Sequence, residues 1–152
     1  MSHPYRLRLL ALLAACVYMA GSMAQPLPPT AGYVAKVVGA AFVTRLGRTT
    51  PAALGQAIVE GMTLRTGAAG GLAVILDDGT VMSFGPHSEL RLDRYRFAPA
   101  SERFGLNAHF SQGTLSLDTG ALARLDPEAI RLTTPHGRIE VHAGHALLKV
   151  AR

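Results

Sequence analysis

The chain has 152 residues, with 15 lysine and arginine residues against 10 aspartate and glutamate residues, one cysteine and no tryptophan. It contains no glycine-rich phosphate loop, dinucleotide fingerprint or Ser-His-Asp spacing, so the usual signatures of nucleotide-dependent enzymes and serine hydrolases are excluded. The absence of tryptophan also argues against a surface of stacked aromatic side chains for binding sugars.

Residues 1–24 predict a secretory signal peptide. Two arginines, Arg6 and Arg8, precede an uncharged and mostly apolar run over residues 9–20, and small residues follow it up to Ala24. The run is shorter than the roughly 20 apolar residues of a membrane span. We expect cleavage after Ala24, which leaves 152 − 24 = 128 residues. A chain of that length can bury a core as one domain, in the periplasm or secreted.

A second interpretation of the leader comes from "LAAC", residues 13–16, which resembles the lipobox of bacterial lipoproteins. In that case Cys16 would carry a lipid and hold the protein on the membrane. We favour the plain signal peptide, because the residues after Cys16 are apolar where a lipoprotein usually has a polar tether. The mature chain then has no disulfide, no thiol nucleophile and no cysteine metal ligand.

Removal of the leader also lowers the charge of the protein. Loss of Arg6 and Arg8 reduces the 15 basic residues to 13 against 10 acidic ones, so the formal net charge falls from +5 to +3. This small excess predicts a mildly basic, solvated surface. We expect no nucleic-acid partner, because an exported protein rarely meets one.

The mature chain predicts one all-β domain. Residues 25–31 form a proline-rich lead, and residues 32–152 contain short runs rich in Val, Leu, Ile, Thr and Phe that are separated by glycine at nearly regular intervals. Such runs are typical of short antiparallel strands and hairpins. We expect a single domain with a sandwich-like or solenoid-like arrangement.

The stretch "VILDDGTVMSF", residues 74–84, predicts the first clear hairpin. Asp78-Gly79 between two apolar runs favours a two-residue type I′ turn that pairs Leu76 with Val81. Both faces of this hairpin are apolar, so we expect it inside the sheet. Asp77 and Asp78 also raise the possibility of a calcium site, but the alternating acidic ligands and final glutamate of a calcium loop are missing, and turn chemistry explains the pair better.

Beyond this hairpin, the apolar side of the strand changes in "RLDRYRF", which predicts a bulge near Asp93-Arg94. The apolar alternation over residues 106–117 predicts a second hairpin that turns at Gln112-Gly113. We therefore expect two separate strands in that range.

The C-terminal part predicts one helical turn and a third hairpin. In "DPEAI", residues 126–130, a proline follows a capping aspartate, which favours a single turn of helix. In "IRLTTPHGRIEV", residues 130–141, Pro135 and Gly137 occupy positions that suit a hairpin turn.

Asp118-Thr119-Gly120-Ala121 follows a predicted strand and matches the catalytic tetrapeptide of aspartic proteases, in which two carboxylates share one proton. A single copy would require a homodimer of the retropepsin kind. Only 32 residues follow Gly120, which is too little for the rest of such a fold. We favour a turn, because short motifs often match by accident.

Two further groups of residues are candidates for ligand binding. His136, His142 and His145 gather near the C-terminus, but a strand sends residues three apart to opposite faces, so we expect no metal site there. Four arginines form a possible anion-binding strip or, equally, an ordinary solvated face. They are Arg91, Arg94, Arg96 and Arg103.

The order of these motifs resembles the FecR-domain family of bacterial envelope proteins, over about residues 32–150. The most specific block has a Leu-x-Thr-Gly, a strand, Asp-Gly-Thr, a second strand and a Ser-x-Leu, within "LGQAIVEGMTLRTGAAGGLAVILDDGTVMSFGPHSELRL". The chain departs from the family at Met62, where many members have an acidic residue, and at residues 141–146. The resemblance implies a stand-alone, all-β envelope domain that senses or relays signals through protein contacts.

The sequence thus predicts a non-catalytic periplasmic or secreted protein that acts as an interaction or signal-relay module, with another envelope or sensor protein as its partner. We expect no catalytic residues, cofactor or metal, and membrane association only through a lipid on Cys16. One alternative is a module that binds envelope glycans or lipids through the four arginines. The other is the retropepsin-like aspartic protease.

Overall fold

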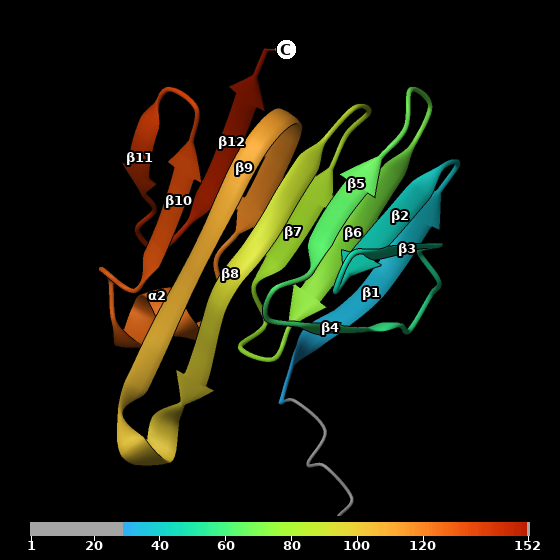
Figure 1. Cartoon of the computed structure of the whole chain (residues 1–152). Helices are drawn as coiled ribbons and strands as arrows, with labels where there is room; N and C mark the ends of the chain where they lie inside the picture. Colours follow the sequence, from blue (N-terminus) through green and yellow to red (C-terminus); the bar gives the residue numbers. More distant parts are fainter. Residues whose placement is uncertain (1–28, 152) are drawn as a thin grey trace, which may run out of the picture.

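In the computed structural model, residues 29–151 form twelve strands and two short helices (Figure 1). The elements are β1 (Thr30–Val38), β2 (Ala41–Arg45), β3 (Arg48–Pro51), β4 (Ala57–Val59), β5 (Thr63–Thr66), β6 (Gly71–Leu76), β7 (Val81–Phe84), β8 (Glu89–Ala98), the 3-10 helix η1 (Pro99–Ser101), β9 (Arg103–Asp118), α2 (Ala121–Leu125), β10 (Ile130–Thr134), β11 (Gly137–Glu140) and β12 (His145–Val150). The predicted signal peptide, with Cys16, lies outside the described residues. Strand β1 begins two residues before the expected domain start at Gly32.

The prediction of an all-β protein built from short, mostly antiparallel strands is confirmed. The strands follow the order β3-β2-β5-β8-β9-β7-β6-β1-β4, and the sheet curls into a half-barrel (Figure 1). The loop over residues 52–56 joins β3 to β4, so one short connection links the two ends of this order. Strand β10 pairs in parallel with β9, and β11 and β12 complete the structure beside them.

Strand β9 runs through both halves of the curled sheet. Its first half pairs with β8 and β10, and its second half pairs with β7 and β12. The predicted hairpin over residues 106–117 is therefore wrong. The chain bends at Gly113, where φ is +98°, and does not turn back. Ser88 packs so closely against Gly113 that no side chain fits there, and each half of the strand already has its own partners.

The hairpin between β6 and β7 lies inside the sheet, but its register differs from the prediction by one residue. Ile75 pairs with Val81, and the N–H of Leu76 donates to the carbonyl of Thr80 at 2.8 Å. Three residues, 77–79, form the loop, and Gly79 has a φ of +82°. This is the three-residue hairpin in which glycine takes the left-handed position. The corrected register places the buried side chains of both strands on one face, toward the core.

Two other expectations near β8 and β10 are confirmed. The register of β8 against β9 shifts between Leu92 and Arg94, which is the predicted bulge. Strands β10 and β11 pair as a hairpin whose turn residues are Pro135 and His136, with Gly137 as the first residue of β11.

The helical turn lies earlier than predicted. Helix α2 ends at Leu125, and residues 126–129 form a turn in which the N–H of Glu128 donates to the Asp126 carboxylate at 3.1 Å. The aspartate thus caps a turn and not a helix. Helix α2 forms where Leu122 and Ala123 reach the core, so burial of these two side chains determines its position.

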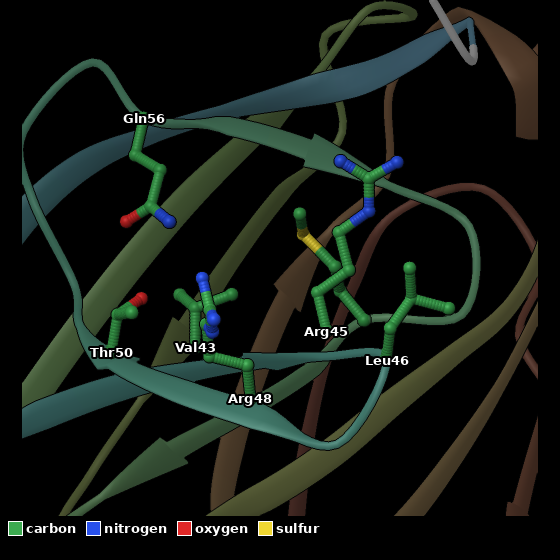
Figure 2. Close-up of a pocket in the computed structure, with 7 residues that line it drawn as sticks. Val43, Arg45, Leu46, Arg48, Thr50 and Gln56 are labelled. Carbon is green, nitrogen blue, oxygen red and sulfur yellow. The ribbon is translucent and has the colours of Figure 1, made fainter.

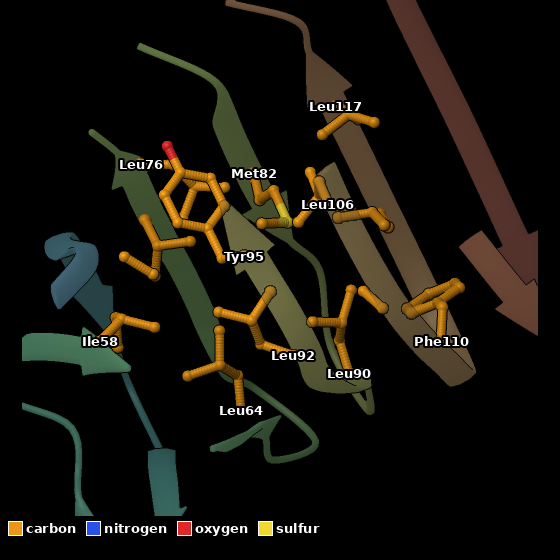
Figure 3. Close-up of a cluster of buried hydrophobic side chains, with 14 of the residues drawn as sticks. Ile58, Leu64, Leu76, Met82, Leu90, Leu92, Tyr95, Leu106, Phe110 and Leu117 are labelled. Carbon is orange, nitrogen blue, oxygen red and sulfur yellow. The ribbon is translucent and has the colours of Figure 1, made fainter. Parts of the chain in front are cut away.

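The core fills the inside of the curled sheet (Figure 3). Apolar side chains from nearly every strand contribute to it, and alternate residues along β9 bring in Leu106, Phe110 and Leu117 from both halves of that strand. All three side chains are fully buried. Burial of each such side chain contributes about 1.5–3 kcal/mol, so the shared strand holds the two halves together.

Replacement of Gly113 by alanine will destabilise the protein by about 2 kcal/mol or more, because the new methyl group meets Ser88 and alanine disfavours a positive φ. Gly105→Ala is the matched control, since Gly105 lies in the same strand with open space around it. Urea unfolding of the two variants checks this. Equal stability of both would contradict the bend at Gly113.

Candidate functional site

The buried polar side chains of the described residues serve the structure itself. They are Thr66, Asp78, Thr80, Ser88 and Thr134. Within residues 29–151, every deeply buried side-chain nitrogen or oxygen atom has a hydrogen-bond partner. None of these groups therefore needs a ligand to complete its hydrogen bonds.

Asp78 is the centre of the densest of these networks, and it is only 6% exposed. Its carboxylate accepts hydrogen bonds from the Tyr95 hydroxyl at 3.0 Å, the Thr80 hydroxyl at 2.6 Å and the Leu122 N–H at 3.1 Å. The Thr80 N–H adds a longer one at 3.3 Å. Four donors from three parts of the chain thus surround one buried charge, and they tie the β6–β7 loop to β8 and α2.

Tyr95 completes this junction. Its hydroxyl donates to the Asp78 carboxylate and accepts from the Asp78 N–H at 2.9 Å. Burial raises the pKa of Tyr95 well above its ordinary value of 10.0, and the neighbouring carboxylate adds to the effect because a second negative charge beside it is unfavourable. Tyr95 therefore stays protonated and keeps its hydrogen bond to Asp78.

Asp77, beside it in the loop, is exposed and does not share these contacts. Within residues 29–151, no three or more His, Cys, Asp and Glu side chains converge on a common point that could hold a metal ion. The two aspartates therefore have separate environments, and Asp78 acts as the acceptor of a structural junction.

Asp118 is the last residue of β9, and Thr119-Gly120 leads into α2, which begins at Ala121. The Asp118 carboxylate is exposed and lies 2.6 Å from Nδ1 of His145. The Thr119 hydroxyl bonds the backbone of Gly144, at 2.7 Å to its N–H and 3.0 Å to its carbonyl. Gly120 packs against the β6–β7 loop with no room for a side chain. In this chain these residues form a connection that anchors the start of β12.

The structure separates the three C-terminal histidines. His145 begins β12 and faces Asp118, whereas His136 lies in the β10–β11 turn and His142 in the following loop. All three are exposed.

The four candidate arginines lie on one outward face, along β8 and at the start of β9. The topology adds Arg131, since Arg94 and Arg131 both pair with Asn107 on β9. Acidic residues interrupt this surface: Arg91 forms an ion pair with Asp93, and Asp126 lines the hollows around Arg94. The alternating signs favour a solvated surface of mixed charge over an anion-binding strip.

Strand β12 is an edge strand, and within residues 29–151 it pairs only with β9. It has six residues, whereas the other edge strands β3, β4 and β11 have three or four. Leu147 on β12 is 69% exposed. An edge of this length with an exposed apolar side chain offers unpaired backbone groups to an added strand.

A separate hollow lies where β2 and β3 curl toward β4 (Figure 2). It is lined by Val43, Arg45, Leu46, Arg48, Thr50, Gln56 and Met62, and its volume is about 610 Å³. The sequence interpretation missed this site. The sequence feature that could have indicated it is "RLGR", residues 45–48. A two-residue turn at Leu46-Gly47 places the flanking arginines opposite each other.

Comparisons of the chain with protein-family models, with curated proteins and with solved structures find no match. The resemblance to the FecR-domain family therefore stays a prediction from the sequence. No helix within residues 29–151 combines the length and the hydropathy needed to cross a membrane.

Replacement of Asp78 by asparagine will lower the free energy of unfolding by about 2–4 kcal/mol, because an amide group presents donors to the donors that surround it. Asp77→Asn is the matched control and will change stability by less than about 0.5 kcal/mol, since Asp77 is exposed. Urea unfolding at neutral pH measures both. A loss of similar size in the two variants would show that Asp78 is not the junction.

Alkaline pH will weaken the fold through Tyr95. The pKa of Tyr95 is higher in the folded protein than in the unfolded chain, so its contribution to stability is complete below pH 10 and declines as the pH rises above that value. Tyr95→Phe will flatten this decline in unfolding experiments between pH 9 and pH 11, whereas Tyr33→Phe will not. Identical pH profiles for the two variants would rule out the role of Tyr95.

Proposed function

We propose that this protein is a non-catalytic, FecR-like domain of the bacterial envelope that works as a protein–protein interaction or signal-relay module. The observation that supports this most directly is the free edge of β12, with its exposed Leu147. Polar groups that the sequence offered as catalytic candidates are engaged in contacts that hold loops and strand ends together.

Strand addition is the mode of binding that we propose. An extended segment of a partner would pair its backbone with β12, and its alternate apolar side chains would lie beside Leu147. The other edges suit this less well. Although β12 carries one exposed lysine, Lys149, it has six residues, whereas β3, β4 and β11 have three or four, and β3 ends at Pro51, which has no N–H to donate.

The geometry around β12 supports a preformed docking edge. The Asp118–His145 contact and the bonds of Thr119 to Gly144 hold its first end against β9, and the burial of Leu148 and Val150 holds the rest. A rigid strand loses little conformational entropy when a partner adds to it. Most of the conformational entropy lost on binding is then lost by the partner segment.

The proposed location rests on the sequence. The leader at residues 1–24 supports export to the periplasm or secretion, and a lipid on Cys16 would instead anchor the domain to the membrane. The partner we propose is another envelope or sensor protein, which the resemblance to FecR domains also suggests.

Leu147→Lys will reduce capture of the partner at least about tenfold, because a charge beside the edge opposes the addition of an apolar strand. The measurement is chemical crosslinking in intact cells that express the tagged protein, followed by affinity purification and quantification of the crosslinked product. The matched control is Leu54→Lys, since Leu54 is 75% exposed but lies in the loop before β4.

Both variants change an exposed leucine to the same charged residue, so they will fold with similar stability. Failure of the wild-type protein to form a specific crosslinked product would contradict the proposed function. Equal yields from the two variants would contradict the role of β12.

A further inference from the structure

The β2–β3 hairpin places two positive charges directly opposite each other. Arg45 pairs with Arg48 across the two-residue turn Leu46-Gly47, whose φ angles are +48° and +76°. Side chains directly opposite on an antiparallel pair share one face, and like charges in that arrangement are destabilising. The hairpin therefore carries two exposed like charges at its tip, and they repel each other when no anion is present.

This pair of arginines faces the inside of the curled sheet. Strand alternation puts Arg45 on the same side as Val43, which is 2% exposed and belongs to the core. Val43 in turn pairs with Thr50 on β3. Figure 2 shows both arginine side chains reaching into the hollow between the hairpin and β4, with Gln56 opposite them.

The polar groups around the hollow are suited to an anion. Of the residues that line it none is acidic, and within residues 29–151 neither arginine forms an ion pair. The Gln56 side-chain oxygen accepts from the Ala53 N–H at 3.1 Å, which leaves its amide group as a donor, and Thr50 adds a hydroxyl. Glu60, the acidic residue nearest in sequence to Gln56, directs its carboxylate to the Tyr95 N–H at 2.8 Å.

We infer that this hollow binds a phosphate group carried on a partly apolar molecule. A guanidinium group binds phosphate through paired hydrogen bonds, and two such groups match the two charges and several oxygens of a phosphomonoester, whereas one carboxylate satisfies a single arginine. The hollow, at about 610 Å³, has room for more than the phosphate.

Apolar side chains identify where the rest of the ligand lies. Val43 and Met62 form the inner part of the hollow, and Leu46 is 94% exposed at its rim. An apolar side chain that is held outward between two arginines suits a phospholipid with a phosphomonoester headgroup and its acyl chains beside Leu46, or a soluble phosphomonoester with an apolar body. The site lies where the two ends of the strand order, β3 and β4, come together, and no residue of β12 lines it, so it is independent of the proposed function.

The first test is thermal unfolding in sodium phosphate and in sodium chloride of equal ionic strength. Phosphate will raise the Tm of the wild-type protein, because a ligand that binds only the folded state stabilises it. The double variant Arg45→Gln/Arg48→Gln will lose this rise. In chloride it will have a Tm at least equal to that of the wild type, since it lacks the repulsion between the arginines.

The matched control is Arg131→Gln/Arg138→Gln, which removes the same charge from exposed arginines on β10 and β11. This variant will keep the phosphate effect. Absence of a phosphate effect in the wild type, or an equal effect in both double variants, would overturn the proposal. The Tm in chloride reports separately that the variants fold.

The second test identifies the source of the phosphate by cosedimentation with vesicles. Vesicles of phosphatidic acid, whose headgroup is a phosphomonoester, and phosphatidylcholine that bind the wild-type protein at least about tenfold better than the Arg45→Gln/Arg48→Gln variant would assign a lipid headgroup. Leu46→Asn, which suits the left-handed backbone, will then reduce vesicle binding but keep the phosphate effect on Tm. Phosphate protection without vesicle binding would assign a soluble phosphorylated ligand.

Discussion

The fold depends on one strand, β9, that belongs to both halves of the curled sheet. Its sixteen residues pair with four other strands, and its inward side chains enter the core on both sides of the bend at Gly113. Any break in this strand would separate β8 and β10 from β7 and β12. The close contact of Gly113 with Ser88 is therefore the local condition on which the arrangement rests.

Buried polar residues hold together the loops and strand ends that meet around the bend. Asp78 and Tyr95 join the β6–β7 loop, β8 and α2 at one place, and Ser88 joins β9 to the loop before β8. Burial of the Asp78 carboxylate is costly unless hydrogen-bond donors surround it. The network around it therefore favours the one arrangement of loop, strand and helix that supplies these donors. Among the described residues, the strand edges and the hollow beside β4 lie outside these networks.

Several local features were predictable because they need only neighbouring residues. The β10–β11 hairpin follows from Pro135 and Gly137, and the bulge in β8 follows from a change in apolar parity near Asp93. The register of the β6–β7 loop was missed by one residue, since Asp78 points inward to Tyr95, which lies far along the chain. The arginine pair beside β4 was also missed, although its turn is local, because the hollow needs Gln56 and Met62 opposite it.

The sequence by itself determined the all-β character, the glycine-bounded strands and the predicted leader, because periodicity and turn chemistry act over a few residues. Only the tertiary structure decided that residues 103–118 form one bent strand, since alternating apolar residues around a glycine look the same in a hairpin and in a bend. It also decided which strands end as free edges. That outcome depends on pairing between segments distant in the chain, which no local pattern encodes.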